Sequence, residues 1–174
     1  MIHLYTGDGK GKTTAAIGLC VRAAGAGMPA VFSQFMKGND SGELHALKQM
    51  SGVRIVRSPK EFGFYHTLSE EQKAELSGIH DRLLDEIRMA LERGECGMAV
   101  LDEITYPLNW GLLSRDKLFS LLRMARGQKE GPELVLTGRD PAPVLMECAD
   151  YVTEMKALRH PYEKGILARK GIEY

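Results

Sequence analysis

The stretch Thr6-Gly-Asp-Gly-Lys-Gly-Lys-Thr-Thr14 comes directly after a short apolar segment, residues 1–5. Gly7, Gly9 and Gly11 can take backbone conformations that are closed to other residues, and they turn backbone N–H groups toward a single anion. A helix-like pattern begins at the same place, so the first N–H groups and the positive dipole end of that helix face the same anion. The strand, the glycine-rich turn and the helix together predict a phosphate-binding loop.

The side chains of this stretch fit a nucleotide triphosphate. Lys12 is placed to bridge phosphate oxygens, and the hydroxyl of Thr13 lies where P-loop proteins hold Mg²⁺. Lys10 adds a second positive charge inside the loop. The strict P-loop pattern has glycine at position 6, where this chain has Thr6, so only the Gly11-Lys12-Thr13 end matches fully. An ordinary glycine-rich turn before a helix is the alternative interpretation.

The composition limits the classes of protein to consider. The chain has 174 residues with 44% apolar content and no shift in composition, which predicts one domain spanning residues 1–174. Lys plus Arg and Asp plus Glu each total 23. The resulting zero net charge argues against nucleic acid or an anionic membrane as a partner.

The cysteines and the apolar runs indicate the compartment. Cys20, Cys96 and Cys148 are odd in number and contain no C-x-x-C pair, which argues against a disulfide framework and a zinc knuckle. We interpret them as buried thiols in a reducing environment. No apolar run approaches the ~20 residues that a membrane-spanning helix needs. A cytoplasmic protein is therefore expected.

Strand-like and helix-like segments alternate along the chain, which is typical of an α/β protein with a parallel sheet. We expect a P-loop (RecA-like) three-layer sandwich with a mainly parallel central sheet of about five to six strands. Besides the first strand, the expected strands are residues 29–34, 53–57, 98–101, 133–137 and 151–155. The expected helices are residues 13 to 25 or 27, 42–50, 69–94 with a capping box at Ser69 and Gln72, 114–126 and 141–149.

A second chemical signal is Met98-Ala-Val-Leu-Asp-Glu103, an apolar strand that ends in two carboxylates. This resembles a Walker B element, because ligands of a parallel sheet bind at the carboxyl ends of its strands. Asp102 would then hold Mg²⁺ directly or through water, and Glu103 would orient a water, pair with a basic residue or act as a base. Taken alone, the pattern is also a common way for a strand to end.

Two arginines are candidate phosphate ligands. Arg139, in Leu136-Thr-Gly-Arg-Asp140, follows a strand that ends on the same side of the sheet and could bind a phosphate in a bidentate manner. A surface arginine in a turn is an equal alternative. Arg22 lies among apolar residues of the first helix, and we expect it to pair with a carboxylate or a phosphate.

Several stretches, in this order, extend the pattern over nearly the whole chain. They are Thr-Gly-Asp-Gly-Lys-Gly-Lys-Thr-Thr from Thr6, Gln-Phe-Met-Lys-Gly from Gln34, Leu-Asp-Glu-Ile-Thr-Tyr from Leu101, Leu-Thr-Gly-Arg from Leu136, Ala-Asp-Tyr-Val-Thr-Glu-Met from Ala149, and the final stretch from His160. Together they resemble the P-loop family of ATP:corrinoid adenosyltransferases. Thr6, which departs from the strict P-loop pattern, is also typical of this family.

The resemblance implies transfer of the 5′-deoxyadenosyl group of ATP to the Co(I) of a reduced corrinoid, with triphosphate released, in adenosylcobalamin biosynthesis or salvage. It also implies a homodimer, and an electron donor such as a reductase or flavoprotein. The ATP site that we expect comprises Thr6, Gly7, Asp8, Gly9, Lys10, Gly11, Lys12, Thr13, Thr14, Arg22 and Arg139. Within the site, Lys10, Lys12 and Glu103 serve catalysis, and Thr13, Asp102 and Glu103 hold Mg²⁺.

Corrinoid binding is where the sequence departs from the family. The family usually carries Gly-Phe-Thr-Trp in the loop after the third strand, whereas this chain has Phe62-Gly-Phe-Tyr-His66 without tryptophan. Phe64, with Tyr65 or His66 beside it, is the candidate corrinoid surface, and a dimer contact is the alternative. The sole tryptophan, Trp110, follows the Asp-Glu strand and could serve packing instead.

Three rival functions stay open. In a nucleoside or small-molecule kinase, Asp102 or Glu103 would act as base and ADP would be the product. In an ATP-dependent binding switch without catalysis, the loop 62–66 would contact a protein partner. The third rival is a diverged relative that handles corrinoid without transferring the adenosyl group.

Overall fold

The computed structural model describes residues 1–126 and 130–173, and its centre is one six-stranded parallel sheet. The strands lie in the order β3-β2-β4-β5-β1-β6. Their bounds are β1 Ile2–Thr6, β2 Ala30–Gln34, β3 Val53–Arg57, β4 Met98–Asp102, β5 Glu133–Thr137 and β6 Tyr151–Glu154. All five pairings between neighbouring strands are parallel. The α/β fold class is therefore confirmed.

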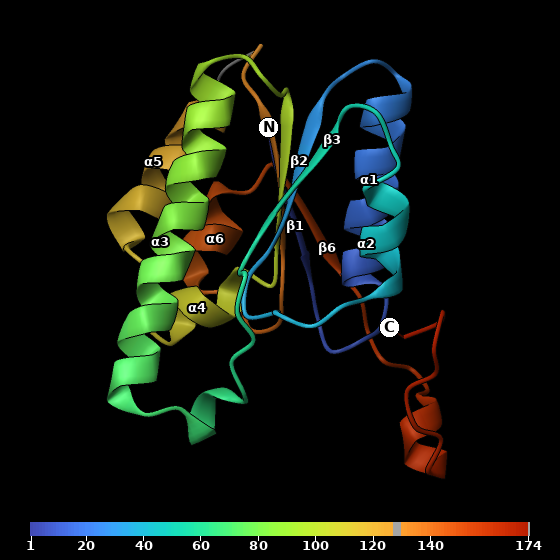
Figure 1. Cartoon of the computed structure of the whole chain (residues 1–174). Helices are drawn as coiled ribbons and strands as arrows, with labels where there is room; N and C mark the ends of the chain where they lie inside the picture. Colours follow the sequence, from blue (N-terminus) through green and yellow to red (C-terminus); the bar gives the residue numbers. More distant parts are fainter. Residues whose placement is uncertain (127–129, 174) are drawn as a thin grey trace.

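Helices cover both faces of the sheet and make three layers (Figure 1). The helices α1 (Lys12–Gly25) and α2 (Gly42–Leu47) pack on one face. The other face is covered by α3 (Glu70–Glu92), α5 (Arg115–Ala125) and α6 (Pro143–Cys148). The short α4 (Thr105–Asn109) lies at the carboxyl ends of the strands, the lower edge of the sheet in Figure 1. Two 3-10 turns, η1 (Tyr65–Thr67) and η2 (Pro161–Lys164), complete the described elements.

The central strands are buried on both faces, since a parallel sheet carries helices on each side. Every residue of β2 and β4 is buried, whereas all four residues of the edge strand β6 are exposed. On α3, the predicted apolar stripe is buried against this sheet; its members are Leu76, Ile79, Leu83, Ile87 and Leu91. The periodic spacing of these residues had predicted which face of the helix turns inward.

The structure confirms most expected element bounds and corrects a few. The capping box of α3 is present, because Ser69 Oγ accepts from the Gln72 N–H at 3.2 Å and Gln72 Oε1 accepts from the Ser69 N–H at 2.9 Å. The helices expected at residues 42–50 and 141–149 are shorter, at Gly42–Leu47 and Pro143–Cys148. Helix α4 was not expected, because it is only five residues long and contains Pro107. Such a short segment shows no periodicity to detect.

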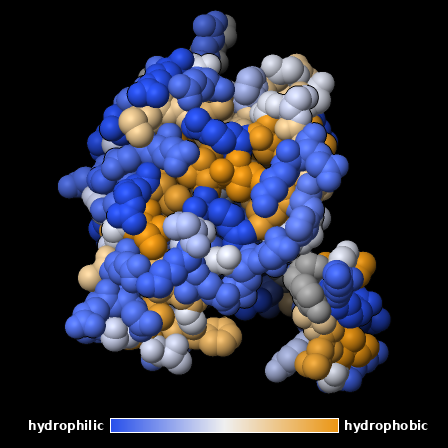
Figure 2. Space-filling view, viewed as in Figure 1, coloured by the Kyte–Doolittle hydropathy of each residue, from blue (hydrophilic) through white to orange (hydrophobic). Residues whose placement is uncertain are grey.

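The surface view shows apolar side chains at the centre of one face, between the two helix layers, with polar side chains around them (Figure 2). The segment after β6 extends from the lower edge of the domain (Figures 1 and 2). It exposes several large apolar side chains, among them Leu158, Tyr162 and Leu167. Among the described helices, none is long and apolar enough to cross a bilayer.

Candidate nucleotide-binding site

The carboxyl ends of four strands bring the predicted site residues together. β5 lies between the strand of the glycine-rich loop, β1, and the strand of the two carboxylates, β4. Asp102 is in register with Gln34 of β2, and Thr137 of β5 is in register with Tyr5 of β1. The loop after β1, Asp102 and Thr137 therefore meet at one edge of the sheet, as the rule for parallel sheets predicts.

The loop between β1 and α1 is a turn that only glycine can form at two positions. Gly7 and Gly11 have positive φ angles of 97° and 112°. A Cβ atom on Gly7 or Gly9 would also collide with the backbone of Met155, which follows β6. Lys12 Nζ donates to the carbonyl oxygens of Gly7 and Gly9, both at 2.7 Å, so its ammonium group lies in the centre of the loop.

Three cationic side chains surround this loop. Arg139 is exposed and donates to the carbonyl oxygen of Asp8 at 3.1 Å, which places its guanidinium beside the loop. Burial, and then the nearby charge of Arg139, lower the pKa of Lys12. Lys10 is exposed and forms an ion pair of 3.4 Å with Glu173. Cations that repel one another around glycine N–H groups form a site that an anion would stabilise.

Asp102 is a fully buried carboxylate with three donors around it. Its Oδ1 accepts from the hydroxyls of Thr13 at 2.8 Å and Thr137 at 2.7 Å, and its Oδ2 accepts from Lys37 Nζ at 3.0 Å. Each partner comes from a different element: Thr13 from α1, Thr137 from β5 and Lys37 from the loop after β2. A buried charge is stable only with such partners.

Glu103 begins the loop after β4 in a strained conformation. Its φ is 62°, a value that non-glycine residues rarely adopt, and strain of this kind gathers at functional sites. Its N–H donates to Thr137 Oγ1 at 2.9 Å, and its carboxylate pairs with Lys37 Nζ at 3.1 Å. Burial raises the pKa of Glu103, against the lowering effect of Lys37.

Lys37 therefore holds both acidic residues at once. Burial lowers its pKa, but the charges of Asp102 and Glu103 outweigh that effect, so the pKa lies above its usual value. In the sequence, Lys37 was part of the stretch Gln-Phe-Met-Lys-Gly that resembles the family, and we assigned it no function. The carboxyl end of β2 lies beside that of β4, so the strand order would have indicated this contact.

Two cavities lie next to each other at this edge. One, of about 510 Å³, is lined by Thr13 and Thr14 of α1. The other, of about 490 Å³, is lined by Phe62 and Phe64. Lys37, Glu43 and Glu173 line both cavities, so the space next to Thr13 and Thr14 adjoins residues 62–66, the aromatic loop.

Among the four ring side chains of the aromatic loop, Phe64 is exposed and Tyr65 is stacked. Phe64 is 85% exposed, which suits a surface that receives a flat ligand. Tyr65 instead stacks on Trp110, with ring centroids 4.4 Å apart and an angle of 14° between the planes. His66 lies 6.5 Å from the same indole ring. Trp110, at the end of α4, thus packs against the aromatic loop through the ring of Tyr65.

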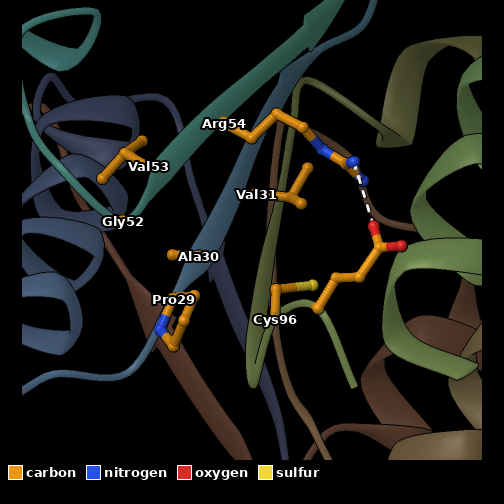
Figure 3. Close-up of a pocket in the computed structure, with 8 residues that line it drawn as sticks. Pro29, Ala30, Val31, Gly52, Val53, Arg54 and Cys96 are labelled. Carbon is orange, nitrogen blue, oxygen red and sulfur yellow. Dashed lines mark hydrogen bonds and ion pairs between the residues drawn. The ribbon is translucent and has the colours of Figure 1, made fainter. Parts of the chain in front are cut away.

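A further hollow, of about 230 Å³, lies elsewhere in the molecule (Figure 3). Its lining comes from the amino ends of strands β2, β3 and β4, the opposite edge of the sheet from the phosphate loop. Arg54 and Glu95 form an ion pair beside it. The thiol of Cys96 points into it, and burial raises the pKa of this thiol, which disfavours the thiolate form. All three cysteines are free and buried, as expected.

Arg22, predicted as an ATP ligand, does not lie at the phosphate loop. It is exposed in the last turn of α1. Ten helical residues separate it from Lys12, which amounts to about 15 Å along the axis. The apolar neighbours of Arg22 suggested burial, but among them only Ala23 is buried, and Val21 is exposed like Arg22 itself. Its assignment to ATP stays a prediction.

A parallel sheet with a glycine-rich loop, a helix at its anion-binding end and a buried Asp beside it defines a P-loop nucleotide-binding protein. A solved structure has a similar fold. The KaiC-like protein PH0186 of Pyrococcus horikoshii OT3 matches with a TM-score of 0.55 and 17% identity, over 89% of this chain and 70% of that one.

Comparison of sequences narrows the class to a family. The model of the family described as ATP:corrinoid adenosyltransferase BtuR/CobO/CobP matches residues 1–174. The corrinoid adenosyltransferase of Pseudomonas aeruginosa is 32% identical, and the corrinoid adenosyltransferase CobA of Salmonella typhimurium is 30% identical. Each match covers 100% of this chain, with 83% and 85% of the respective relative. This chain belongs to the ATP:corrinoid adenosyltransferase family of enzymes.

Proposed function

We propose that this protein transfers the 5′-deoxyadenosyl group of ATP to the Co(I) of a reduced corrinoid and releases triphosphate. In this reaction the electron pair of Co(I) attacks C5′, a cobalt–carbon bond forms, and the bond from C5′ to the triphosphate oxygen breaks. The electrons of that bond leave with the triphosphate. Cobalt is the nucleophile, so no protein nucleophile is required. The protein has to orient the two substrates and stabilise the leaving group.

The observation that carries this proposal is the pair of adjoining cavities in a chain that its family model matches from end to end. One cavity is lined by Thr13 and Thr14, at the start of the helix that follows the phosphate loop, and the other is lined by Phe64. With the triphosphate on the loop, the sugar carbon of ATP would face the aromatic side. Phe64 would then contact the corrinoid, and Trp110 would support that loop through Tyr65.

The cations around the loop suit the departing triphosphate. Lys12 would release the carbonyl oxygens of Gly7 and Gly9 and bind phosphate oxygens instead. Lys10 and Arg139 would add charge from either side. Charge-assisted hydrogen bonds of this kind are about twice as strong as neutral ones. The first N–H groups of α1 would complete the anion site.

The acidic residues fit a magnesium ion. A hydroxyl and carboxylate oxygens are the ligands that Mg²⁺ prefers, and Thr13 Oγ1 lies 2.8 Å from Asp102 Oδ1. We infer that Thr13 and Asp102 hold the ion, with Glu103 binding through water. Bound there, Mg²⁺ would neutralise charge on the triphosphate. Lys37 would exchange part of its contact with the two carboxylates for the ion.

The test is an anaerobic incubation with Mg-ATP and chemically reduced Co(I) corrinoid. We expect a light-sensitive adenosylcorrinoid, seen in the visible spectrum, together with one triphosphate per product. The Lys12→Ala variant should lose transfer, whereas Lys117→Ala, on the α3–α5 surface, should keep it. Formation of ADP with a small acceptor would replace the proposal with a kinase. Tight ATP binding without any product would indicate a switch or a corrinoid-handling relative.

Two further features belong to the proposal. A reductase or flavoprotein would supply the electron that forms Co(I), and the protein would act as a homodimer in the cytoplasm. Sedimentation at micromolar concentration tests the dimer directly. A single species with the mass of one chain, 19.3 kDa, would refute it.

A further inference from the structure

The segment after β6 is attached to the phosphate loop at both of its ends. At the near end, the carbonyl oxygen of Met155 accepts from the Gly9 N–H at 2.7 Å, and the Ala157 N–H donates to Asp8 Oδ1 at 3.1 Å. At the far end, Glu173 pairs with Lys10. Figure 1 shows the chain leaving the sheet and turning back toward it. The far end therefore returns to the loop that the near end already contacts.

Glu173 is held in one orientation by Arg169. Its Oε2 accepts from the Arg169 N–H at 2.8 Å and from Nε at 3.3 Å, while its Oε1 accepts from Nη2 at 3.2 Å. These hydrogen bonds from Arg169 lower the pKa of Glu173 to about 2, so the side chain is ionised at neutral pH. An ionised carboxylate has about four acceptor sites, and Arg169 takes three of them while Lys10 contacts Oε1. A further donor can therefore bind Oε1 once Lys10 turns to the triphosphate.

The position of Glu173 is the central observation. It lines the cavity beside the phosphate loop and the cavity beside Phe64. Given the proposed function, the triphosphate occupies the first and the corrinoid approaches from the second. The ribose that joins the triphosphate to the reacting carbon then has to lie between them, next to Glu173.

We propose that the carboxylate of Glu173 accepts hydrogen bonds from the ribose hydroxyls of ATP. Acidic side chains take ribose hydroxyls in the same way in dinucleotide-binding folds. Lys10 and Arg169 flank the carboxylate and offset its repulsion from the triphosphate. The segment 155–173 thereby becomes a wall of the nucleotide site, with Gly171 and Ile172 lining the same cavity.

Isothermal titration of the full chain with Mg-ATP, Mg-2′-deoxyATP and Mg-3′-deoxyATP tests this assignment. Loss of one hydrogen bond to a charged acceptor weakens binding by about tenfold. The wild type should therefore bind at least one deoxynucleotide about tenfold more weakly than ATP. Glu173→Ala should weaken ATP binding by a similar factor, leave that deoxynucleotide unchanged, and so abolish the discrimination. Glu163→Ala, a glutamate of the same segment in η2, should behave as the wild type.

Three results would overturn the assignment. Equal tightening of all three nucleotides in Glu173→Ala would mean that the carboxylate only repels phosphate. Unchanged binding of all three would place the segment outside the site. Discrimination that persists in Glu173→Ala would assign the hydroxyls to another residue. If the wild type binds no nucleotide at all, the proposed function fails as well, which separates the two conclusions.

Discussion

Replacing Lys37 by methionine tests the acidic centre of the site. Lys37 Nζ lies 3.0 Å from Asp102 Oδ2 and 3.1 Å from Glu103 Oε1, and its side chain is 33% exposed. Methionine keeps much of the length and the apolar stem but removes the charge. Asp102, which is fully buried, and Glu103 would then repel each other without a cation between them.

The size of the effect follows from these contacts. Leaving a buried charge without its partner costs about 3–5 kcal/mol. Asp102 keeps the hydroxyls of Thr13 and Thr137, and solvent reaches Lys37, so the cost should be lower. We expect a loss of about 2 kcal/mol in the free energy of unfolding, because solvent screening weakens partly exposed ion pairs. For a chain of this size that is a fall in Tm of about 4–8 °C.

Thermal unfolding of the wild type and of Lys37→Met, with and without millimolar Mg²⁺, measures the effect. The ion should stabilise Lys37→Met more than the wild type, since Lys37 no longer competes for the carboxylates. The matched control is Lys117→Met, which removes a 2.6 Å pair with the half-exposed Asp85. Such surface pairs contribute at most about 1 kcal/mol.

The contribution of Lys37 to the stability of the fold should fall as pH rises. The pKa of Lys37 is raised in the folded state, so its stabilisation is fully present below its ordinary pKa of 10.5 and is lost as pH rises through the folded value. The wild type should therefore lose extra stability at alkaline pH, and Lys37→Met should not. If the variant unfolds at the wild-type temperature, without any response to Mg²⁺, then the bridge contributes nothing and the reasoning is wrong.

Three other predictions use different parts of the structure. Gly138→Ala should destabilise the protein by more than about 2 kcal/mol, because φ is 147° and a Cβ would collide with Thr105; a denaturant midpoint equal to that of the wild type would contradict this. Burial lowers the pKa of His80, which is fully enclosed, so its stabilisation is present above pH 6.5 and is lost as pH falls; His80→Gln should flatten this acid-side slope in thermal melts. Phe64→Ala should raise the KM for corrinoid with little change in that for ATP or in Tm, while the equally exposed Leu158→Ala should change neither; equal losses for both substrates would assign Phe64 to the fold.

The features that the sequence predicted correctly are those that depend on near neighbours. The glycines of the phosphate loop, the capping box at Ser69 and the apolar stripe of α3 each occupy one short window. The strand that ends at Asp102 is equally local, and the parallel-sheet rule was enough to place its carboxylate near the loop. Local reasoning did not show that Arg22 is exposed, because apolar neighbours in a helix do not say which way an intervening residue points.

The contacts of Thr137 and Lys37 with Asp102 could not be predicted from short windows of the sequence. Thr137 reaches Asp102 because β5 lies between β1 and β4, and Lys37 reaches it because β2 lies on the other side. Strand order depends on which helices pack on which face, and periodicity carries no information about that order. The stacking of Trp110 on Tyr65 likewise joins two loops that the sequence separates by a long helix.

By itself, then, the sequence determined the fold class and the phosphate loop, since glycine conformations, helix caps and apolar periodicity act over a few residues. The family came from the resemblance of its motifs to those of known members. Only the tertiary structure decided that Lys37 bridges two carboxylates, that Trp110 supports the aromatic loop and that Glu173 returns to Lys10. These contacts depend on the strand order and on the return of the segment after β6. The free energy that selects such an arrangement comes from burial over the whole chain, which no short window contains.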